Sequence, residues 1–211
     1  EPILDAYQKS FQRESMIPGG FGDKIFLAED AGEFEKGTAG VQVRSFLRAG
    51  VDTTIAGIGH TLNLLAQNPG EWAKVKAAPA KIRTAFEEAL RLHSPSQVMF
   101  RTTSAPLEFA GLSLAGDVKI GNFMGAANRD PRKFEDPDRF DVDRDVTGVH
   151  LAFGTGPHVC IGQMIARLEA ECILGAIVRR VKAIEPAGDP EYRIVNTLRT
   201  LERLPLRLVP A

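Results

Sequence analysis

One of the two cysteines, Cys160, stands in a segment that glycines interrupt repeatedly: residues 153–162 read Phe-Gly-Thr-Gly-Pro-His-Val-Cys-Ile-Gly. Glycines permit tight turns at positive φ and let a flat ligand approach the backbone. Backbone N–H groups can hydrogen-bond the sulfur, and the N-terminus of the apolar helix predicted to follow favours an anionic thiolate. Phe153 can shield that sulfur from water. The segment therefore predicts a thiolate that faces a metal.

Two alternatives come from the residues alone: a buried free cysteine beside a glycine turn, and a zinc site of His150, His158 and Cys160. The zinc site is the weaker, because no second Cys or His pair has the usual ligand spacing. The whole pattern, Phe-Gly-x-Gly-x-His-x-Cys-x-Gly, resembles the haem-binding loop of cytochrome P-450, the haem-thiolate monooxygenases. The resemblance implies haem b, with Cys160 as the axial iron ligand, His158 as a donor to a propionate, and Phe153 and Gly162 at the cofactor. Such a thiolate favours O–O cleavage.

A second candidate lies in residues 49–54, Ala-Gly-Val-Asp-Thr-Thr, midway along a predicted long helix. Gly50 lets a planar ligand approach the backbone, and a threonine hydroxyl can bend a helix by bonding a backbone carbonyl. An exposed aspartate beside ordinary helical threonines is the alternative. The pattern resembles the acid–alcohol pair of the family's oxygen-binding groove. That resemblance implies that Thr53 stabilises the bound oxygen and that Asp52 gates the supply of protons.

Charged residues on the next helices suggest a structural role. Glu88 and Arg91 are three apart and share a helix face, although Glu87 and Arg91 could equally form a surface pair. The resemblance prefers Glu88–Arg91, joined by Arg139 in a buried triad behind the cysteine loop. For Arg101 the resemblance implies a bond to a haem propionate, which a guanidinium suits. From the residues alone, an exposed strand arginine is the alternative.

Apolar spacing predicts the elements that position these residues. Helices are expected over residues 1–17, 21–31, 38–67, 81–93 and 161–181, and another is expected to start at Pro69 with Asn68 as its N-cap. Residues 124–128 are expected to form a short helix or turn. Short strands are expected within 97–122, and a terminal hairpin over about 192–209. The fold class is therefore mainly α with small β-sheets. The resemblance implies the C-terminal half of the cytochrome P-450 fold, with a long central helix, the Glu-x-x-Arg helix, the cysteine loop and a final long helix.

Composition limits the function classes. The chain has 211 residues, is 44% hydrophobic and carries a net charge of −1, so it can bury a sizeable core and lacks the basic tract of a nucleic-acid binder. No run is long enough for a membrane span, and no signal peptide opens the sequence. Cys160 and Cys172 are poorly placed for a disulfide if they share a helix, which suggests a reduced, cytoplasmic protein. Cys172 is expected to face the core, and His150 to satisfy a local backbone bond.

Without a linker, residues 1–211 are expected to form one unit, the C-terminal haem-binding portion of a cytochrome P-450 domain. The chain opens at Glu1 without a methionine, and members of the family are much longer. A fragment, a truncated reading frame or a partial sequence is therefore expected, with the N-terminal half absent.

Residues 43–54 and 196–205 are also similar to bacterial class I enzymes that oxidise para-substituted benzoates. This similarity implies insertion of one oxygen atom from O₂ by hydroxylation or O-demethylation, with electrons from NADH through a ferredoxin reductase and a ferredoxin. Ser45, two helical turns before Asp52, could bond a substrate carboxylate. The candidate substrate contacts are Ser45, Ala49, Val98, Met99 and Leu198. An inactive haem-binding fragment and a haem sensor or carrier are the alternatives, and the Asp52–Thr53 pair argues against the sensor.

Overall fold

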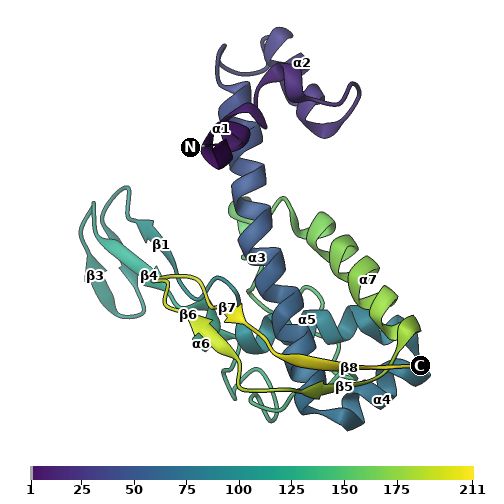
Figure 1. Ribbon diagram of the computed structural model, residues 1–211. Helices are drawn as coiled ribbons and strands as arrows, with labels where there is room; N and C mark the ends of the chain where they lie inside the picture. Colours follow the sequence, from purple (N-terminus) through teal and green to yellow (C-terminus); the bar gives the residue numbers. More distant parts are fainter. Residues whose placement is uncertain (1) are drawn as a thin grey trace. The chain divides into compact units, whose positions relative to one another are not determined.

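The computed structural model describes residues 2–211, which divide into two compact units, one ending at Asp52 and the other beginning at Thr53 (Figure 1). The long helix α3, Ala39–Gln67, contributes residues to both units. Its bounds confirm the helix predicted over residues 38–67. The mainly helical fold with small sheets is likewise confirmed, whereas the haem-binding portion as one unit stays a prediction.

The first unit contains α1 (Pro2–Lys9), a 3₁₀ turn (Arg13–Ser15), α2 (Phe21–Asp30) and the start of α3. Its small core is built from Phe26, Ala39 and Val43, with partly buried apolar residues around them. A Glu29 carboxylate oxygen accepts the Ala39 N–H at 2.7 Å. This bond satisfies a backbone donor that the first turn of α3 would otherwise leave open, and the negative charge suits a helix N-terminus.

The second unit packs α4, α5 and α7 with the rest of α3. These helices are Pro69–Ala77, Ile82–His93 and Gln163–Arg180. The facing sides of α5 and α7 share one apolar core, to which Phe86, Ala89, Leu174 and Val178 contribute. Every residue of α5 from Ala85 to Leu92 is buried, charged residues included. Charges in such a position must be paired, because an isolated buried charge is strongly unfavourable.

Short elements connect these helices. They are the 3₁₀ turns Pro79–Lys81 and Gly156–His158, and the helix α6 (Met124–Ala127). Each described strand pairs with one antiparallel partner. The pairs are β1 (Met99–Thr102) with β4 (Lys119–Asn122), β2 (Leu107–Phe109) with β3 (Leu112–Leu114), β5 (Val181–Pro186) with β8 (Leu206–Pro210), and β6 (Glu191–Arg193) with β7 (Thr200–Arg203).

The expected terminal hairpin over residues 192–209 is partly wrong. Strands β6 and β7 do form a hairpin, but β8 pairs with β5, which begins where α7 ends (Figure 1). Val181, predicted as the last helical residue, is the first residue of β5 and is buried in the core with Ile184. The pairing of β5 with β8 therefore takes Val181 out of the helix, which ends one residue earlier, at Arg180. Within residues 2–211, no helix is long and apolar enough to cross a membrane.

Candidate active site

The cysteine loop is held by its own backbone. Gly154 and Gly156 have φ values of 70° and 71°, a conformation that side chains other than glycine rarely adopt. The Cys160 N–H donates to the Phe153 carbonyl at 2.8 Å, which joins the two ends of the loop. Cys160 is a free, exposed cysteine, separated from the start of α7 at Gln163 by Ile161 and Gly162. The loop therefore presents a thiol outward from a fixed backbone, and a buried cysteine is ruled out.

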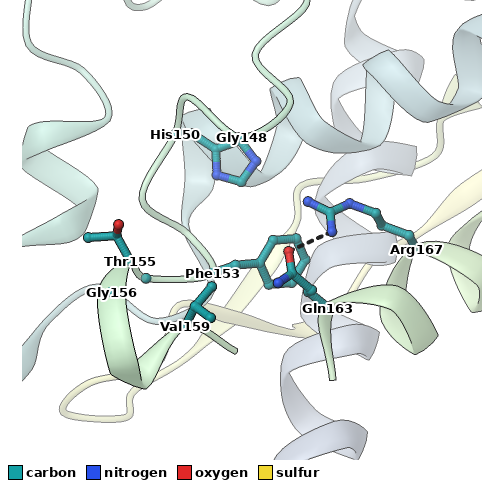
Figure 2. Close-up of a pocket in the computed structure, with 9 residues that line it drawn as sticks. Gly148, His150, Phe153, Thr155, Gly156, Val159, Gln163 and Arg167 are labelled. Atoms are coloured by element: carbon teal, nitrogen blue, oxygen red, sulfur yellow. Dashed lines mark hydrogen bonds between the residues drawn. The ribbon is translucent and has the colours of Figure 1, made fainter. Parts of the chain in front are cut away.

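A cavity of about 260 Å³ lies against this loop (Figure 2). Its lining consists of Gly148, His150, Phe153, Gly154, Thr155, Gly156, Val159, Gln163 and Arg167. Cys160 is not among these residues, so the cavity adjoins the loop without containing the thiol.

The donor set fits a haem better than zinc. No cluster of three His, Cys, Asp or Glu residues within 2–211 could hold a metal ion. His150 is unsuitable as a ligand beside Cys160, because it is buried and its Nε2 lies 2.7 Å from a Glu87 carboxylate oxygen. A haem iron would need only one thiolate from the protein, because the porphyrin supplies four nitrogen ligands, and the exposed Cys160 could provide it. The two proposed propionate donors, His158 and Arg101, are both exposed, and Arg101 Nη1 donates to the Phe100 carbonyl at 2.8 Å.

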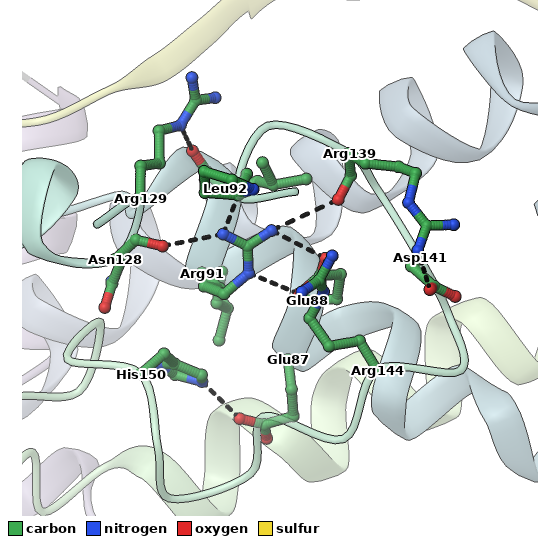
Figure 3. A network of polar contacts seen from close by, with 12 residues as sticks. Glu87, Glu88, Arg91, Leu92, Asn128, Arg129, Arg139, Asp141, Arg144 and His150 are labelled. Carbon is green, nitrogen blue, oxygen red and sulfur yellow. Dashed lines mark hydrogen bonds and ion pairs between the residues drawn. The ribbon is translucent and has the colours of Figure 1, made fainter. Parts of the chain in front are cut away.

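Behind the loop, Glu88 and Arg91 form a fully buried pair (Figure 3). Arg91 Nε and Nη2 reach the two Glu88 carboxylate oxygens at 2.7 and 2.8 Å, a bidentate arrangement. Arg91 Nη1 also donates to the carbonyls of Asn128 and Pro137, at 2.8 and 2.7 Å. The guanidinium therefore joins α5 to two distant segments of the second unit, as expected for a structural role.

The third member of the predicted triad is wrong. The Arg139 side chain is 60% exposed and pairs with Asp141 at 3.0 Å, and only the Arg139 carbonyl faces Arg91, at 3.4 Å (Figure 3). Because this segment turns its carbonyls toward Arg91, its side chain is left on the outer side. Arg144 takes the predicted place, with Nε 3.1 Å from a Glu88 carboxylate oxygen and only 15% of its side chain exposed.

Glu87 does not form the alternative surface pair with Arg91. It is fully buried and accepts hydrogen bonds from His150 Nε2, at 2.7 Å, and from Arg167 Nε. Burial by itself would raise the pKa of Glu87, but the hydrogen bonds from His150 and Arg167 outweigh it and lower that pKa. The sequence does indicate this burial, because the two adjacent glutamates lie between the apolar residues Phe86 and Leu90.

His150 also makes the expected local bond, because its Nδ1 accepts the Ala152 N–H at 3.1 Å. That contact assigns the proton to Nε2, which donates to Glu87.

Cys172 is exposed, so its predicted position in the core is wrong. The buried stripe of α7 runs through Ala170, Leu174 and Val178, at intervals of four residues. Cys172 lies two positions from that stripe and therefore projects from the opposite side of the helix.

The proposed proton-supplying residues are neighbours on α3, with Asp52 exposed and Thr53 half-buried. A side chain at Gly50 would meet no atom within 4 Å, so the backbone there is open to a ligand. Ser45 is exposed and donates its hydroxyl to the Val41 carbonyl at 2.8 Å, while Ala49 is exposed on the same helix. A substrate carboxylate would have to replace that Ser45 bond.

Two of the proposed apolar substrate contacts, Val98 and Leu198, come from segments that are distant in the sequence but adjacent in the fold. Ser96 and Leu198 form an isolated antiparallel bridge, which sets Leu198 beside the segment that leads to Val98. Val98 is buried and Leu198 half-buried, whereas Met99 is 46% exposed.

A histidine cluster was missed in the sequence. The rings of His60 and His93 lie 4.8 Å apart, His60 Nε2 is 3.0 Å from the Arg199 carbonyl, and Arg199 Nε donates to His93 Nδ1 at 3.2 Å. Burial and then the charge of Arg199 lower the pKa of His60 to about 4; burial, His60 and Arg199 lower that of His93 to about 3. Because the contacts join residues up to 139 positions apart, no local pattern pointed to them.

Known proteins resemble this chain over most of its length. A relative in Rhodopseudomonas palustris (strain ATCC BAA-98 / CGA009), "Cytochrome p450 CYP199A2", is 48% identical over 200 residues, or 95% of this chain and 48% of the relative. The "6-deoxyerythronolide B hydroxylase" of Saccharopolyspora erythraea is 38% identical over 165 residues, or 77% of this chain and 41% of that protein. The chain thus spans about half the length of the curated relatives that it matches.

The fold has matching relatives as well. The crystal structure of CYP108D1 from Novosphingobium aromaticivorans DSM12444 matches with a TM-score of 0.82 at 28% identity, covering 99% of this chain and 52% of that one. The family model "Cytochrome P450" matches residues 82–205, more than half of the chain. That range contains both the Glu88–Arg91 pair and the Cys160 loop, and the chain therefore belongs to the cytochrome P450 family.

Proposed function

We propose that this chain is the haem-binding portion of a monooxygenase that inserts one oxygen atom from O₂ into a small organic substrate. The observation that carries the proposal is the exposed Cys160 thiol, presented on a loop that the Phe153–Cys160 backbone bond closes. The test is the ferrous carbon monoxide spectrum of the haem-loaded protein, which distinguishes thiolate ligation from other ligation. Replacing Cys160 by alanine is expected to abolish the thiolate signature, and a retained signature would refute the assignment.

The residues would divide the binding of haem b among them. Cys160 would provide the iron ligand, while His158 and Arg101 would hold the propionates with charge-assisted hydrogen bonds. Phe153 would shield the sulfur from water, and Gly162 at the start of α7 would keep the backbone close to the cofactor. When bound, the haem supplies the chemistry of oxygen activation.

Asp52 and Thr53 would handle protons. The exposed Asp52 carboxylate can exchange a proton with solvent, and the adjacent Thr53 hydroxyl can pass or orient one toward the reacting oxygen. Insertion of one atom of O₂ releases the other as water, which requires two electrons and two protons, so an acid beside a hydroxyl would suit the reaction. Gly50 supports this placement because it leaves the nearby backbone open.

The proposed substrate is a para-substituted benzoate, oxidised by hydroxylation or O-demethylation. Support comes from the similarity of residues 43–54 and 196–205 to bacterial enzymes of that class. Ser45 and Ala49 would contact the substrate from α3, with Ser45 donating to its carboxylate. Val98, Met99 and Leu198 would form an apolar wall for the ring. Electrons would come from NADH through a ferredoxin reductase and a ferredoxin, in the cytoplasm.

A second candidate is a haem-binding fragment without activity. It is favoured by a row of large apolar side chains on and before α7 that are open to solvent, with Ile161, Met164 and Leu168 exposed by 78%, 70% and 61%. Apolar surface of this kind usually marks a missing contact or an aggregation site. The 211-residue chain alone is then expected to aggregate or to bind haem weakly. Stoichiometric haem uptake with coupled benzoate oxidation by this chain would exclude the second candidate.

A further inference from the structure

Glu87 lies behind the cysteine loop and contacts both side chains that enclose the Phe153 ring. His150 bonds Glu87 at 2.7 Å and has its ring centroid 5.9 Å from that of Phe153. Arg167 Nε donates to the other Glu87 carboxylate oxygen, and its guanidinium lies over the Phe153 ring, with Cζ 4.6 Å from the centroid. One buried carboxylate therefore fixes two neighbours of the same ring.

The residue that carries this ring, Phe153, is hydrogen-bonded to Cys160 through its backbone. Phe153 supplies the carbonyl that accepts the Cys160 N–H at 2.8 Å. When the ring loses these neighbours they no longer hold the Phe153 backbone, and a shift of its carbonyl changes the orientation of the peptide group that carries the Cys160 N–H. Hydrogen bonding and backbone placement around a ligating sulfur are among the means by which a protein tunes its metal.

A second connection reaches the other peptide group of Cys160. Arg167 Nη1 donates to the Gln163 side-chain oxygen at 2.8 Å (Figure 2). The Gln163 N–H in turn donates to the Cys160 carbonyl at 3.4 Å. Arg167 thus contacts both residues that hold the Cys160 backbone, one on each side. Its position depends on Glu87, which accepts from both Nε and Nη2 of its guanidinium.

The loop also has room to move if this support is lost. The cavity of about 260 Å³ is lined by His150, Phe153, Gln163 and Arg167 among others. A Phe153 ring released from the two side chains could shift into that space, because no packed atoms would oppose it there. On the side of the cavity, no close packing would hold the Phe153 ring in place of the two side chains that Glu87 fixes.

We propose that Glu87 is a positioning residue for the iron ligand, which acts through His150, Arg167 and Phe153 to fix the backbone of Cys160. The inference rests on the proposed role of Cys160 as that ligand. The role of Glu87 differs from that of Glu88, whose carboxylate bonds Arg91 and Arg144 and thereby joins α5 to other segments of the second unit. Adjacent glutamates on α5 thus serve the loop and the core separately.

The test compares Glu87→Gln with a matched control, Glu171→Gln. Glu171 also pairs an arginine between α5 and α7, but it does so at the surface, with Arg83 Nε at 2.7 Å. The first measurement is amide hydrogen exchange of residues 153–162 in the chain without haem. Glutamine keeps one acceptor oxygen, but its NH2 group cannot accept from the second donor, so at least one charge-assisted hydrogen bond is lost. Glu87→Gln is therefore expected to speed exchange there by about tenfold or more, while α5 exchanges as in the control.

The second measurement is made on the haem-loaded protein. Glu87→Gln is expected to raise the fraction of the neutral-thiol form in the ferrous carbon monoxide spectrum and to shift the reduction potential, and Glu171→Gln is expected to change neither. If Glu87→Gln fails to fold, Arg167→Lys serves in its place, because it keeps the positive charge beside Glu87 and removes the planar group from the Phe153 ring.

Loop exchange and spectra equal to those of the Glu171→Gln control would overturn the inference, as would faster exchange throughout α5 and the loop alike. The proposed function fails separately, if Cys160→Ala retains the thiolate signature. The exchange measurement needs no haem, so the two failures are distinguishable.

Discussion

Replacing Arg91 by methionine is expected to destabilise the second unit by about 3–5 kcal/mol, the usual result of removing one partner of a buried ion pair. Arg91 and Glu88 have no exposed side-chain surface. Methionine fills a similar volume but leaves the carbonyls of Asn128 and Pro137 without their donor. Glu88 keeps Arg144 at 3.1 Å, so the loss is expected in the lower part of that range. Even this is a large part of a typical domain's stability of about 5–15 kcal/mol.

Two further variants show whether the loss of stability comes from the buried ion pair. Glu88→Gln leaves Arg91 bonded to three backbone carbonyls, so a smaller loss of about 1.5–3 kcal/mol is expected. Arg139→Met is expected to change stability by no more than about 0.5 kcal/mol, because its side chain is exposed. These contacts therefore predict that the loss of stability is largest for Arg91→Met, smaller for Glu88→Gln and smallest for Arg139→Met.

Urea unfolding provides the assay. The single tryptophan, Trp72, is buried in the core that contains α5, so its fluorescence reports on that unit. An Arg139→Met variant as unstable as Arg91→Met would show that Arg139 belongs to the network after all. An Arg91→Met variant within about 0.5 kcal/mol of the parent would refute the reasoning about the buried pair.

Two other expectations concern the histidine cluster and the proton-supplying pair. The pKa values of His60 and His93 fall to about 4 and about 3, from 6.5, so their contribution to stability is present above pH 6.5 and is lost as the pH falls through the folded values. His60→Gln should therefore flatten the dependence of the unfolding free energy on pH between 6.5 and about 4, by up to about 1.4 kcal/mol per pH unit; an unchanged slope would show that His60 is not neutral in the folded state. Thr53→Ala should uncouple turnover in the complete enzyme, with NADH still consumed while peroxide rises and product falls, and unchanged coupling would remove Thr53 from the proton path.

Local sequence patterns predicted the parts of this structure that are local. The 29-residue helix α3 and the turns of the cysteine loop follow from apolar spacing and from glycine. The side of α7 that carries Cys172 was predicted wrongly, because the buried stripe depends on where α5 packs.

Contacts across long separations were the ones that sequence could not supply. Glu87 reaches Arg167, which is 80 positions away, and Glu88 reaches Arg144, which is 56 positions away. The sequence offers several arginines for each buried carboxylate. The path of the chain places Arg144, and not Arg139, beside Glu88. The pairing of β5 with β8 has the same cause, because the strand that pairs with Val181 lies far along the chain and no local pattern identifies it.

The ferrous carbon monoxide spectrum of a matched pair of cysteine variants tests the central claim most directly. Both cysteines are free and exposed, so Cys172→Ala controls for the loss of a thiol as such. With haem bound to the complete protein, Cys172→Ala should keep the red-shifted Soret band of thiolate ligation, and Cys160→Ala should lose it. A thiolate band that persists in Cys160→Ala, or that disappears equally in both variants, would contradict the assignment of Cys160 as the iron ligand.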